Sequence, residues 1–227
     1  MTTANTLSHL HPGLDRGLDQ LGLDLPDPVR VALLDYLALL ARWNRTYNLS
    51  AVRDPAQMLV RHLLDSLAVL PHIQGHRLAD IGTGPGLPGI PLALALPQLQ
   101  VLLVDSNGKK ARFLREALRT LGLTQRCQVS QARVETLTDV TGFDTITSRA
   151  FASLADFIAG SRELLAPGGR WLALKGQRPD DEIDALPADV RVDAVVPLQV
   201  PGLAAQRHAI IMSRSGQPGP ATSTGTA

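Results

Sequence analysis

Leucines spaced three or four residues apart predict two amphipathic helices near the start of the chain, because that spacing places side chains on one helical face. In the first helix, which begins near Pro28, the apolar positions are Leu33, Leu37, Leu40 and Trp43. The second begins at Asp54-Pro55-Ala56-Gln57, where a capping acid precedes a proline at the first helical position. Its apolar positions are Leu59, Leu63, Leu67 and Leu70. Residues 1–26 show no strong periodicity and fit either a loose arm or a short helix.

Farther along, short apolar runs alternate with helical patterns, which is typical of a parallel sheet covered by helices. Strands are expected at 78–82, 99–104, 126–130, 143–148 and 170–175, and helices at about 88–96, 109–121 and 153–166. The last two strand-like runs, 192–200 and 207–213, are joined by a short loop that contains Pro201-Gly202. Because no crossover helix separates them, they are expected to pair antiparallel. The pattern predicts an α/β fold whose mostly parallel sheet ends in an antiparallel hairpin.

A glycine loop joins the first of these strands to its helix. Gly82, Gly84 and Gly86 stand two residues apart, so the backbone can turn tightly and approach a ligand. The dinucleotide-binding fingerprint requires a glycine where this chain has Leu87. With Asp80 at the strand end, the pattern acid-x-G-x-G-x-G resembles the first motif of Rossmann-like S-adenosylmethionine methyltransferases. A plain turn in a glycine-rich chain is the alternative.

A second strand-helix unit follows the loop, and its strand ends at an acid. Asp105 lies about 20 residues beyond the loop, where an acidic side chain accepts hydrogen bonds from ribose hydroxyls. We therefore expect Asp105 to hold the ribose of a nucleoside cofactor.

Composition narrows the class of protein. The 227 residues, 44% of them hydrophobic, suffice for one large α/β domain with a small extension. No apolar run reaches the roughly 18 residues that span a bilayer, and the N-terminus has no basic region before an apolar stretch, so a cytoplasmic protein is expected. The single cysteine, Cys127, excludes an internal disulfide and a cysteine zinc site, and we interpret it as a small buried residue.

The formal net charge is only +1, so any binding to nucleic acid must use a local patch. The helix expected at 109–121 offers one, because its outer face carries several cations while its inner face is apolar. The cations are Lys109, Lys110, Arg112, Arg115 and Arg119. A merely solvated helix face is the alternative interpretation.

Four segments together closely resemble the RsmG (GidB) family. They are Arg42–Ser50, Arg53–Leu67, Asp80–Pro91 and Ser148–Ala152, with further matches at Leu174–Gln177 and from Leu198 to His208, so the likeness covers roughly residues 30–213. The resemblance implies a Rossmann-like class I methyltransferase that uses S-adenosylmethionine to methylate guanine N7 in the 530 loop of 16S rRNA. Its partner would be 16S rRNA or the 30S subunit, with no metal and no membrane, and the enzyme would act as a monomer.

We divide the chain accordingly. Residues 1–26 form an arm, 27–72 a helical extension, 73–213 the cofactor-binding methyltransferase domain and 214–227 a disordered tail. Carried over position by position, the family's cofactor contacts fall on Gly82, Leu87, Val134, Glu135 and Arg149. The glycine pattern adds Gly84 and Gly86 to these contacts, and the end of the second strand adds Asp105.

Candidates for the RNA side surround the same helix and the later strand ends. His62, Asp65 and Ser66 share one helix face, as an internal hydrogen-bond cluster or as a wall of the substrate site. Arg53 and Arg61 flank that helix, either as surface charges or as phosphate ligands. Arg149 and Lys175 follow strands whose carboxyl ends face the ligand crevice, and Lys109 and Arg112 represent the outer patch. Trp43 and Tyr47 are interpreted as packing anchors rather than base-stacking platforms.

Guanine N7 carries an exposed lone pair, so no proton has to be removed before attack on a sulfonium methyl. We therefore expect no general base and no catalytic triad, and catalysis by proximity and orientation instead. Three alternatives remain open at this point: a small-molecule methyltransferase, a catalytically idle RNA-binding factor for ribosome assembly, and a nicotinamide oxidoreductase.

Overall fold

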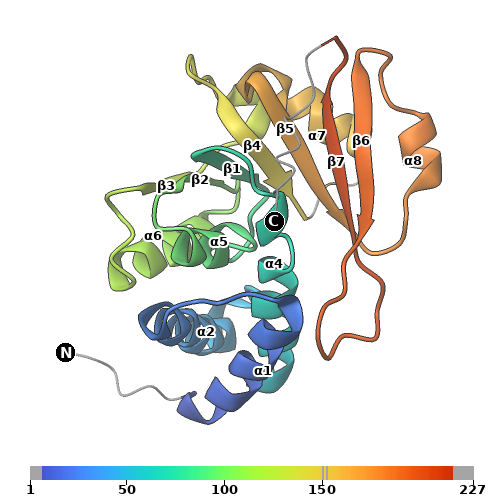
Figure 1. The fold of residues 1–227 in the computed structure, drawn as a ribbon. Coiled ribbons are helices and arrows are strands. Elements are labelled where there is room, and N and C mark those ends of the chain that lie inside the picture. The colour runs from blue at the N-terminus through green and yellow to red at the C-terminus, as the bar shows by residue number, and fades with distance from the viewer. Residues whose placement is uncertain (1–6, 150, 152, 217–227) are drawn as a thin grey trace.

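The computed structural model describes residues 7–149, 151 and 153–216 (Figure 1). In this part of the chain, seven strands form one sheet in the order β3-β2-β1-β4-β5-β7-β6. The strands are β1 (Arg77–Ile81), β2 (Gln100–Val104), β3 (Cys127–Ser130), β4 (Phe143–Ser148), β5 (Leu165–Lys175), β6 (Val190–Pro197) and β7 (His208–Arg214). Strands β1 to β5 pair parallel, and β7 pairs antiparallel with both β5 and β6. The predicted fold class is confirmed.

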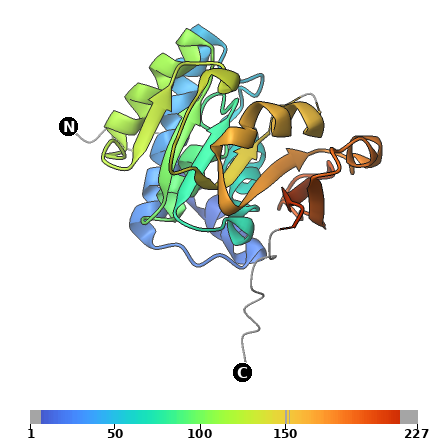
Figure 2. The ribbon, with the colours of Figure 1, turned by 90° about the horizontal axis from the view of Figure 1, so that it is seen from above.

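Helices cover both faces of this sheet. Successive residues of a strand point to opposite faces, so neighbouring residues belong to different cores. On β1, Leu78 joins the core formed with α1 (His11–Leu21), α2 (Asp27–Tyr47), α5 (Gly89–Ala95) and α6 (Gly108–Thr120). Its neighbour Ala79 joins the core under α7 (Leu154–Ser161). Figures 1 and 2 place α6 and the β6–β7 hairpin at opposite ends of the molecule. No helix in the described ranges is both long and apolar enough to cross a membrane.

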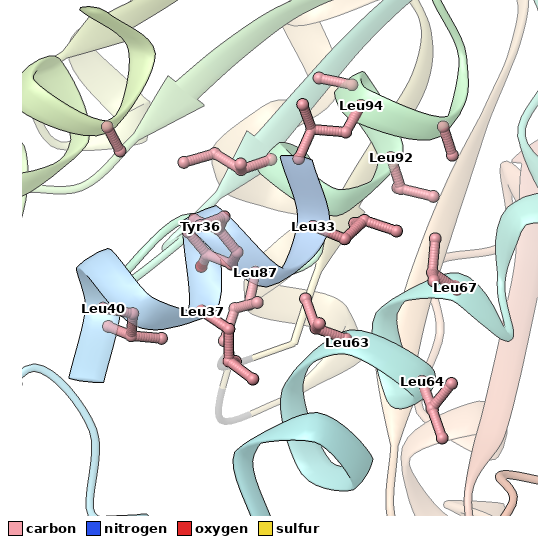
Figure 3. Packing of buried hydrophobic residues seen from close by; sticks show 14 of the residues in the cluster. Leu33, Tyr36, Leu37, Leu40, Leu63, Leu64, Leu67, Leu87, Leu92 and Leu94 are labelled. Carbon is pink, nitrogen blue, oxygen red and sulfur yellow. The ribbon is translucent and has the colours of Figure 1, made fainter. Parts of the chain in front are cut away.

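The N-terminal helices pack directly against the domain that carries the glycine loop. Helix α1, preceded by the 3-10 turn η1 (Ser8–Leu10), gives residues 11–21 a helical structure where the sequence left two possibilities. Helix α2 buries Leu33, Tyr36 and Leu37 against Leu87, which follows the glycine loop (Figure 3).

The second expected helix begins as predicted and then changes its winding. Asp54 caps α3 (Pro55–Met58) by accepting hydrogen bonds from the N–H groups of Ala56 and Gln57. The chain continues as a π-helical turn, η2 (Leu59–Leu64), and then as α4 (Asp65–Leu67). Of the predicted stripe, Leu70 alone is only partly buried, because it lies in the following 3-10 turn η3 (Leu70–His72). Single π turns occur often at functional sites, and this one contains His62.

The helix expected at 153–166 ends earlier than predicted. Helix α7 stops at Ser161, the 3-10 turn η5 (Arg162–Leu164) follows, and β5 already begins at Leu165 rather than at 170. Leu165 pairs with Phe143 of β4, so its burial is satisfied by the sheet instead of by a continued helix. The short helix α8 (Asp180–Asp184) was not predicted. The predicted tail, 214–227, lies outside the described residues from 217 onward.

Candidate cofactor and substrate site

The three glycines of the loop all adopt left-handed backbone conformations. Their φ angles are +67° for Gly82, +62° for Gly84 and +100° for Gly86, a region that side chains disfavour. A Cβ atom on Gly86 would come within 2.5 Å of Ile90, so this glycine permits packing. A Cβ on Gly84 would meet no atom of the described residues within 4 Å. The loop therefore leaves an open side at Gly84, where a ligand can approach the backbone.

Two buried carboxylates hold the loop in place. Asp80 accepts a hydrogen bond from the Thr83 hydroxyl at 2.5 Å and another from the Gly89 N–H at 2.8 Å. Asp105 accepts one from the Gly84 N–H at 2.9 Å. Burial raises the pKa of Asp80 to about 7, and its Oδ1 atom has no hydrogen-bond partner in the described structure. The loop is thus fixed from below by Asp80 and from the side by Asp105.

Asp105 also keeps capacity for a ligand. Its second oxygen accepts the Asn107 N–H at 2.9 Å, and Lys110 lies 3.4 Å from the first. An ionised carboxylate offers about four lone-pair positions, so these contacts leave room for a ribose hydroxyl. The open side at Gly84 and this acid together fit a nucleoside cofactor.

A tyrosine from the N-terminal extension supports the loop as well. The hydroxyl of Tyr36 in α2 donates a hydrogen bond to the carbonyl of Pro85 at 2.9 Å, and burial raises the pKa of this phenol. Tyr36 was not among the predicted site residues. Its place on the buried stripe with Leu33 and Leu37 was a signal, since a buried hydroxyl needs a partner.

The remaining cofactor candidates lie on both sides of the loop. Val134 and Glu135 form the 3-10 turn η4 (Val134–Thr136), which follows β3; Val134 is buried and Glu135 exposed. The side chain of Leu87 packs in the core beside α2 (Figure 3).

On the other side of the loop, a cavity of about 380 Å³ opens beyond the ends of β4 and β5. It brings together five residues that the sequence proposed for the RNA side, with others that it did not. The five are Arg61, His62, Asp65, Arg149 and Lys175. The complete lining is Val52, Arg61, His62, Asp65, Arg149, Leu174, Lys175, Gly176, Leu198, Arg207 and His208. Four cationic side chains and one carboxylate give this cavity a positive character.

Asp65 stands between two arginines in this cavity. Its Oδ2 accepts a hydrogen bond from Arg149 at 3.1 Å, and its Oδ1 accepts one from Arg207 at 2.9 Å. The Asp65 side chain is only 5% exposed, and Arg149 also donates to the Arg61 carbonyl at 3.3 Å. Arg207 precedes β7 and was not among the predicted site residues. The pairing of β7 with β5 sets Lys175 beside His208 and so carries Arg207 into the site.

His62 of η2 and Asp65 and Ser66 of α4 have different surroundings. The Nε2 atom of His62 lies 2.8 Å from the Ser50 hydroxyl, and its Nδ1 has no partner in the described structure. Burial lowers the pKa of His62 to about 4, so the ring is neutral near pH 7. Ser66 is completely buried and does not line the cavity. His62 and Asp65 thus belong to the wall of the cavity, and no hydrogen bond joins the three residues.

Two other predicted cations have hydrogen-bond partners of their own. Lys175 donates to both oxygens of Glu182 in α8, at 2.8 and 3.0 Å. Arg53 is exposed, donates to the Asn48 side chain at 2.8 Å and does not line the cavity. Glu182 was not predicted, because nothing in the sequence pattern marks α8.

A shallower groove of about 710 Å³ lies along α6, lined by Asn107, Gly108, Lys109, Arg112, Arg115 and Gln131. Among the described residues, neither Lys109 nor Arg112 nor Arg115 forms an ion pair, whereas Arg119 of the same helix pairs with Glu116. The outer patch therefore presents unpaired cations.

The Trp43 ring lies 5.1 Å from Tyr47 and 5.6 Å from Phe113 of α6, which favours their interpretation as packing anchors.

Known proteins share both sequence and architecture with this chain. Residues 30–211 match the family model described as rRNA small subunit methyltransferase G (GidB). A ribosomal RNA small subunit methyltransferase G from Xanthomonas axonopodis pv. citri is 53% identical over 214 residues, which cover 94% of this chain and 100% of the relative. A protein of the same name from Alkalilimnicola ehrlichii is 52% identical over 199 residues, covering 88% and 90% of the two chains.

Solved structures agree on the fold. TrmN from Thermus thermophilus superposes with a TM-score of 0.54 at 22% identity, over 75% of this chain and 53% of that one. A protein of the NADB-Rossmann superfamily from Streptococcus agalactiae gives a TM-score of 0.56 at 17% identity, over 66% and 67%. At these identities the likeness extends to the Rossmann-like architecture alone.

Proposed function

This chain belongs to the rRNA small subunit methyltransferase G family, and from that membership we propose that it transfers a methyl group from S-adenosylmethionine to N7 of a guanine in the 530 loop of 16S rRNA. The observation that carries the proposal is the position of two features at one edge of the sheet. The glycine loop follows β1, and the cationic cavity lies beyond the ends of β4 and β5. At β1 the order of the sheet changes direction, with β2 and β3 on one side and β4 and β5 on the other. Ligands of open α/β sheets bind at such a switch point.

In this proposal, the glycine loop and the residues that follow β2 and β3 hold the nucleoside part of the cofactor. Gly84 admits the ligand to the loop backbone, Asp105 accepts the ribose hydroxyls, and Val134 and Glu135 border the adenine. When bound, S-adenosylmethionine supplies a methyl group activated by its positively charged sulfur. Arg149, which follows β4, lines the cavity.

The cavity residues would bind and orient the RNA. Arg61, Arg149 and Arg207 provide donors suited to phosphate or to a base oxygen. Because N7 of neutral guanine already carries a lone pair, the reaction requires no general base. The protein contributes orientation and exclusion of water, which lower the barrier by several kcal/mol in favourable cases.

The division of the chain follows the same proposal. Residues 27–72 form the extension whose Tyr36 supports the loop, and 73–213 form the methyltransferase domain. The partner is 16S rRNA, free or within the 30S subunit, and a monomer working on ribosomal subunits would act in the cytoplasm.

Methyl transfer to subunits that lack the modification tests the proposal. Purified protein is incubated with labelled S-adenosylmethionine and either naked 16S rRNA or 30S subunits from a deletion strain, and the labelled nucleotide is mapped. The expected product is a single 7-methylguanosine in the 530 loop. Label at another base, or no label in RNA with a folded and cofactor-bound protein, would contradict the proposal.

A further inference from the structure

The order of the strands places the two groups of candidate residues on different sides of the glycine loop. Asp105 and Val134 follow β2 and β3 on one side of the glycine loop, whereas the cavity follows β4 and β5 on the other. If the proposed function is correct, a guanine enters the cavity with its N7 edge turned toward the loop. Its N1–H and N2–H₂ groups would then lie on the edge turned away from the loop, within reach of the cavity lining to which Asp65 belongs.

The polar side chains of that lining include many donors and few acceptors. Guanine's N1 and N2 groups are both donors and need acceptors, but most polar side chains of the cavity are cations. Among the described residues that line it, Asp65 is the one carboxylate. Within the described part of the chain, each of its oxygens accepts one hydrogen bond, from Arg149 or from Arg207. Since an ionised carboxylate has about four lone-pair positions, Asp65 retains acceptors for two more donors.

We propose that Asp65 is the residue that selects guanine, by accepting hydrogen bonds from N1–H and N2–H₂ of the target base. Arg149 and Arg207 hold the carboxylate in one orientation, so its free lone pairs keep a fixed direction. Adenine would present the lone pair of its N1 to the same carboxylate and would be repelled. Selection therefore combines an attractive contact with the right base and a repulsive one with the wrong base.

The experiment removes one donor from the base and the charge from the protein. Reconstituted 30S subunits carry either guanosine or inosine at the methylated position, because inosine differs only in lacking the N2 amine. For the wild-type enzyme, kcat/KM on inosine should be about 10- to 100-fold lower than on guanosine, the range for a hydrogen bond to a charged group. In Asp65→Asn, activity on guanosine should fall and the ratio between the two substrates should shrink to within about threefold.

A matched control keeps this ratio specific. Asp105→Asn also changes a buried carboxylate beside the loop, and it should weaken cofactor binding while leaving the guanosine-to-inosine ratio at its wild-type value. Calorimetry with S-adenosylhomocysteine and thermal unfolding verify that each variant is folded. If Asp65→Asn does not fold, Asp65→Glu serves instead, since it keeps the charge between the arginines but shifts the carboxylate, and it should also reduce the ratio.

The contrary results are separate from failure of the proposed function. A wild-type enzyme that methylates inosine as well as guanosine would overturn the role of Asp65. A variant that loses activity equally on both bases would do the same, because Asp65 would then only position Arg149. Failure of the proposed function appears differently, as absence of methyl transfer by the wild-type enzyme to either subunit.

Discussion

The glycine loop and the cationic cavity share one edge of the sheet, yet they hold their buried carboxylates in different ways. Asp80, beneath the loop, accepts hydrogen bonds from neutral donors, the Thr83 hydroxyl and the Gly89 N–H. Asp65, in the cavity, accepts them from two guanidinium groups. Asp80 thus shapes a backbone without a cationic partner, and desolvation raises its pKa to about 7. Asp65, in contrast, is held by two positively charged side chains.

This difference predicts that the loop and the cavity respond to different kinds of substitution. In the proposed function, the loop would bind the cofactor through the shape of its backbone, so substitutions there should act through steric strain and through the ionisation of Asp80. The cavity would bind RNA through side chains from segments distant in sequence, so substitutions there should act on charge and donor geometry. Breaking either region by the mechanism assigned to the other would show that the distinction is wrong.

The largest effect is expected from Gly84→Val. Valine would fill the open side of the loop and resist a φ of +62°, so binding of S-adenosylmethionine should be abolished, as measured by calorimetry. Gly122→Val is the matched control, because Gly122 has a φ of +69° and equally open surroundings but follows α6. Both variants should lose a similar amount of stability, about 1–2 kcal/mol, and only Gly84→Val should lose the cofactor. Unchanged affinity in folded Gly84→Val would remove the loop from the site.

A pH dependence of stability is expected from Asp80. Its pKa is raised from 3.8 to about 7 in the folded protein, so the unfolded chain loses this proton first as the pH rises. The stabilisation is complete below about pH 4 and is lost between pH 4 and 7, on the order of 4 kcal/mol in all. Urea unfolding of wild type and Asp80→Asn from pH 4.5 to 8 measures it. Parallel curves for the two proteins would show that Asp80 ionises normally.

A smaller effect is expected from Arg149 in the cavity. Arg149→Ala leaves Asp65 with Arg207 alone, and methyl transfer should fall by about 10- to 100-fold, the loss of a charged hydrogen bond. Arg149→Lys keeps the charge without the planar fork, so it should recover little if donor geometry matters and most of the rate if charge alone matters. Single-turnover methylation beside cofactor affinity distinguishes these results, and wild-type rates in both variants would exclude Arg149.

The two regions also differ in how far the sequence predicts them. The glycines, Asp80 and Asp105 lie within two consecutive strand-helix units, where local patterns determine the geometry. The cavity depends on longer separations, and the Asp65–Arg207 contact joins residues 142 positions apart. Arg207 reaches Asp65 because β7 pairs with β5, a register that no local pattern contains. The early end of α7 at Ser161 has the same origin, since the pairing of Leu165 with β4 overrides the helical pattern.

The smallest effect is expected from the outer groove on α6, which extends the comparison to a surface remote from the cavity. Lys109 and Arg112 have no ion-pair partner among the described residues, so they are free to neutralise RNA phosphates. Lys109→Ala combined with Arg112→Ala should raise KM for 30S subunits a few-fold and reduce the slope of log affinity against log salt by about 1 to 2, since each lost phosphate contact lowers it by 0.7 to 0.9. Arg119→Ala, whose arginine already pairs with Glu116, should change the slope less. The maximal single-turnover rate and the cofactor affinity should stay at wild-type values, because the groove acts on docking rather than on the reacting base. If the salt slopes of both variants equal that of wild type, the patch is a solvated helix face and RNA docks through the cavity cations alone.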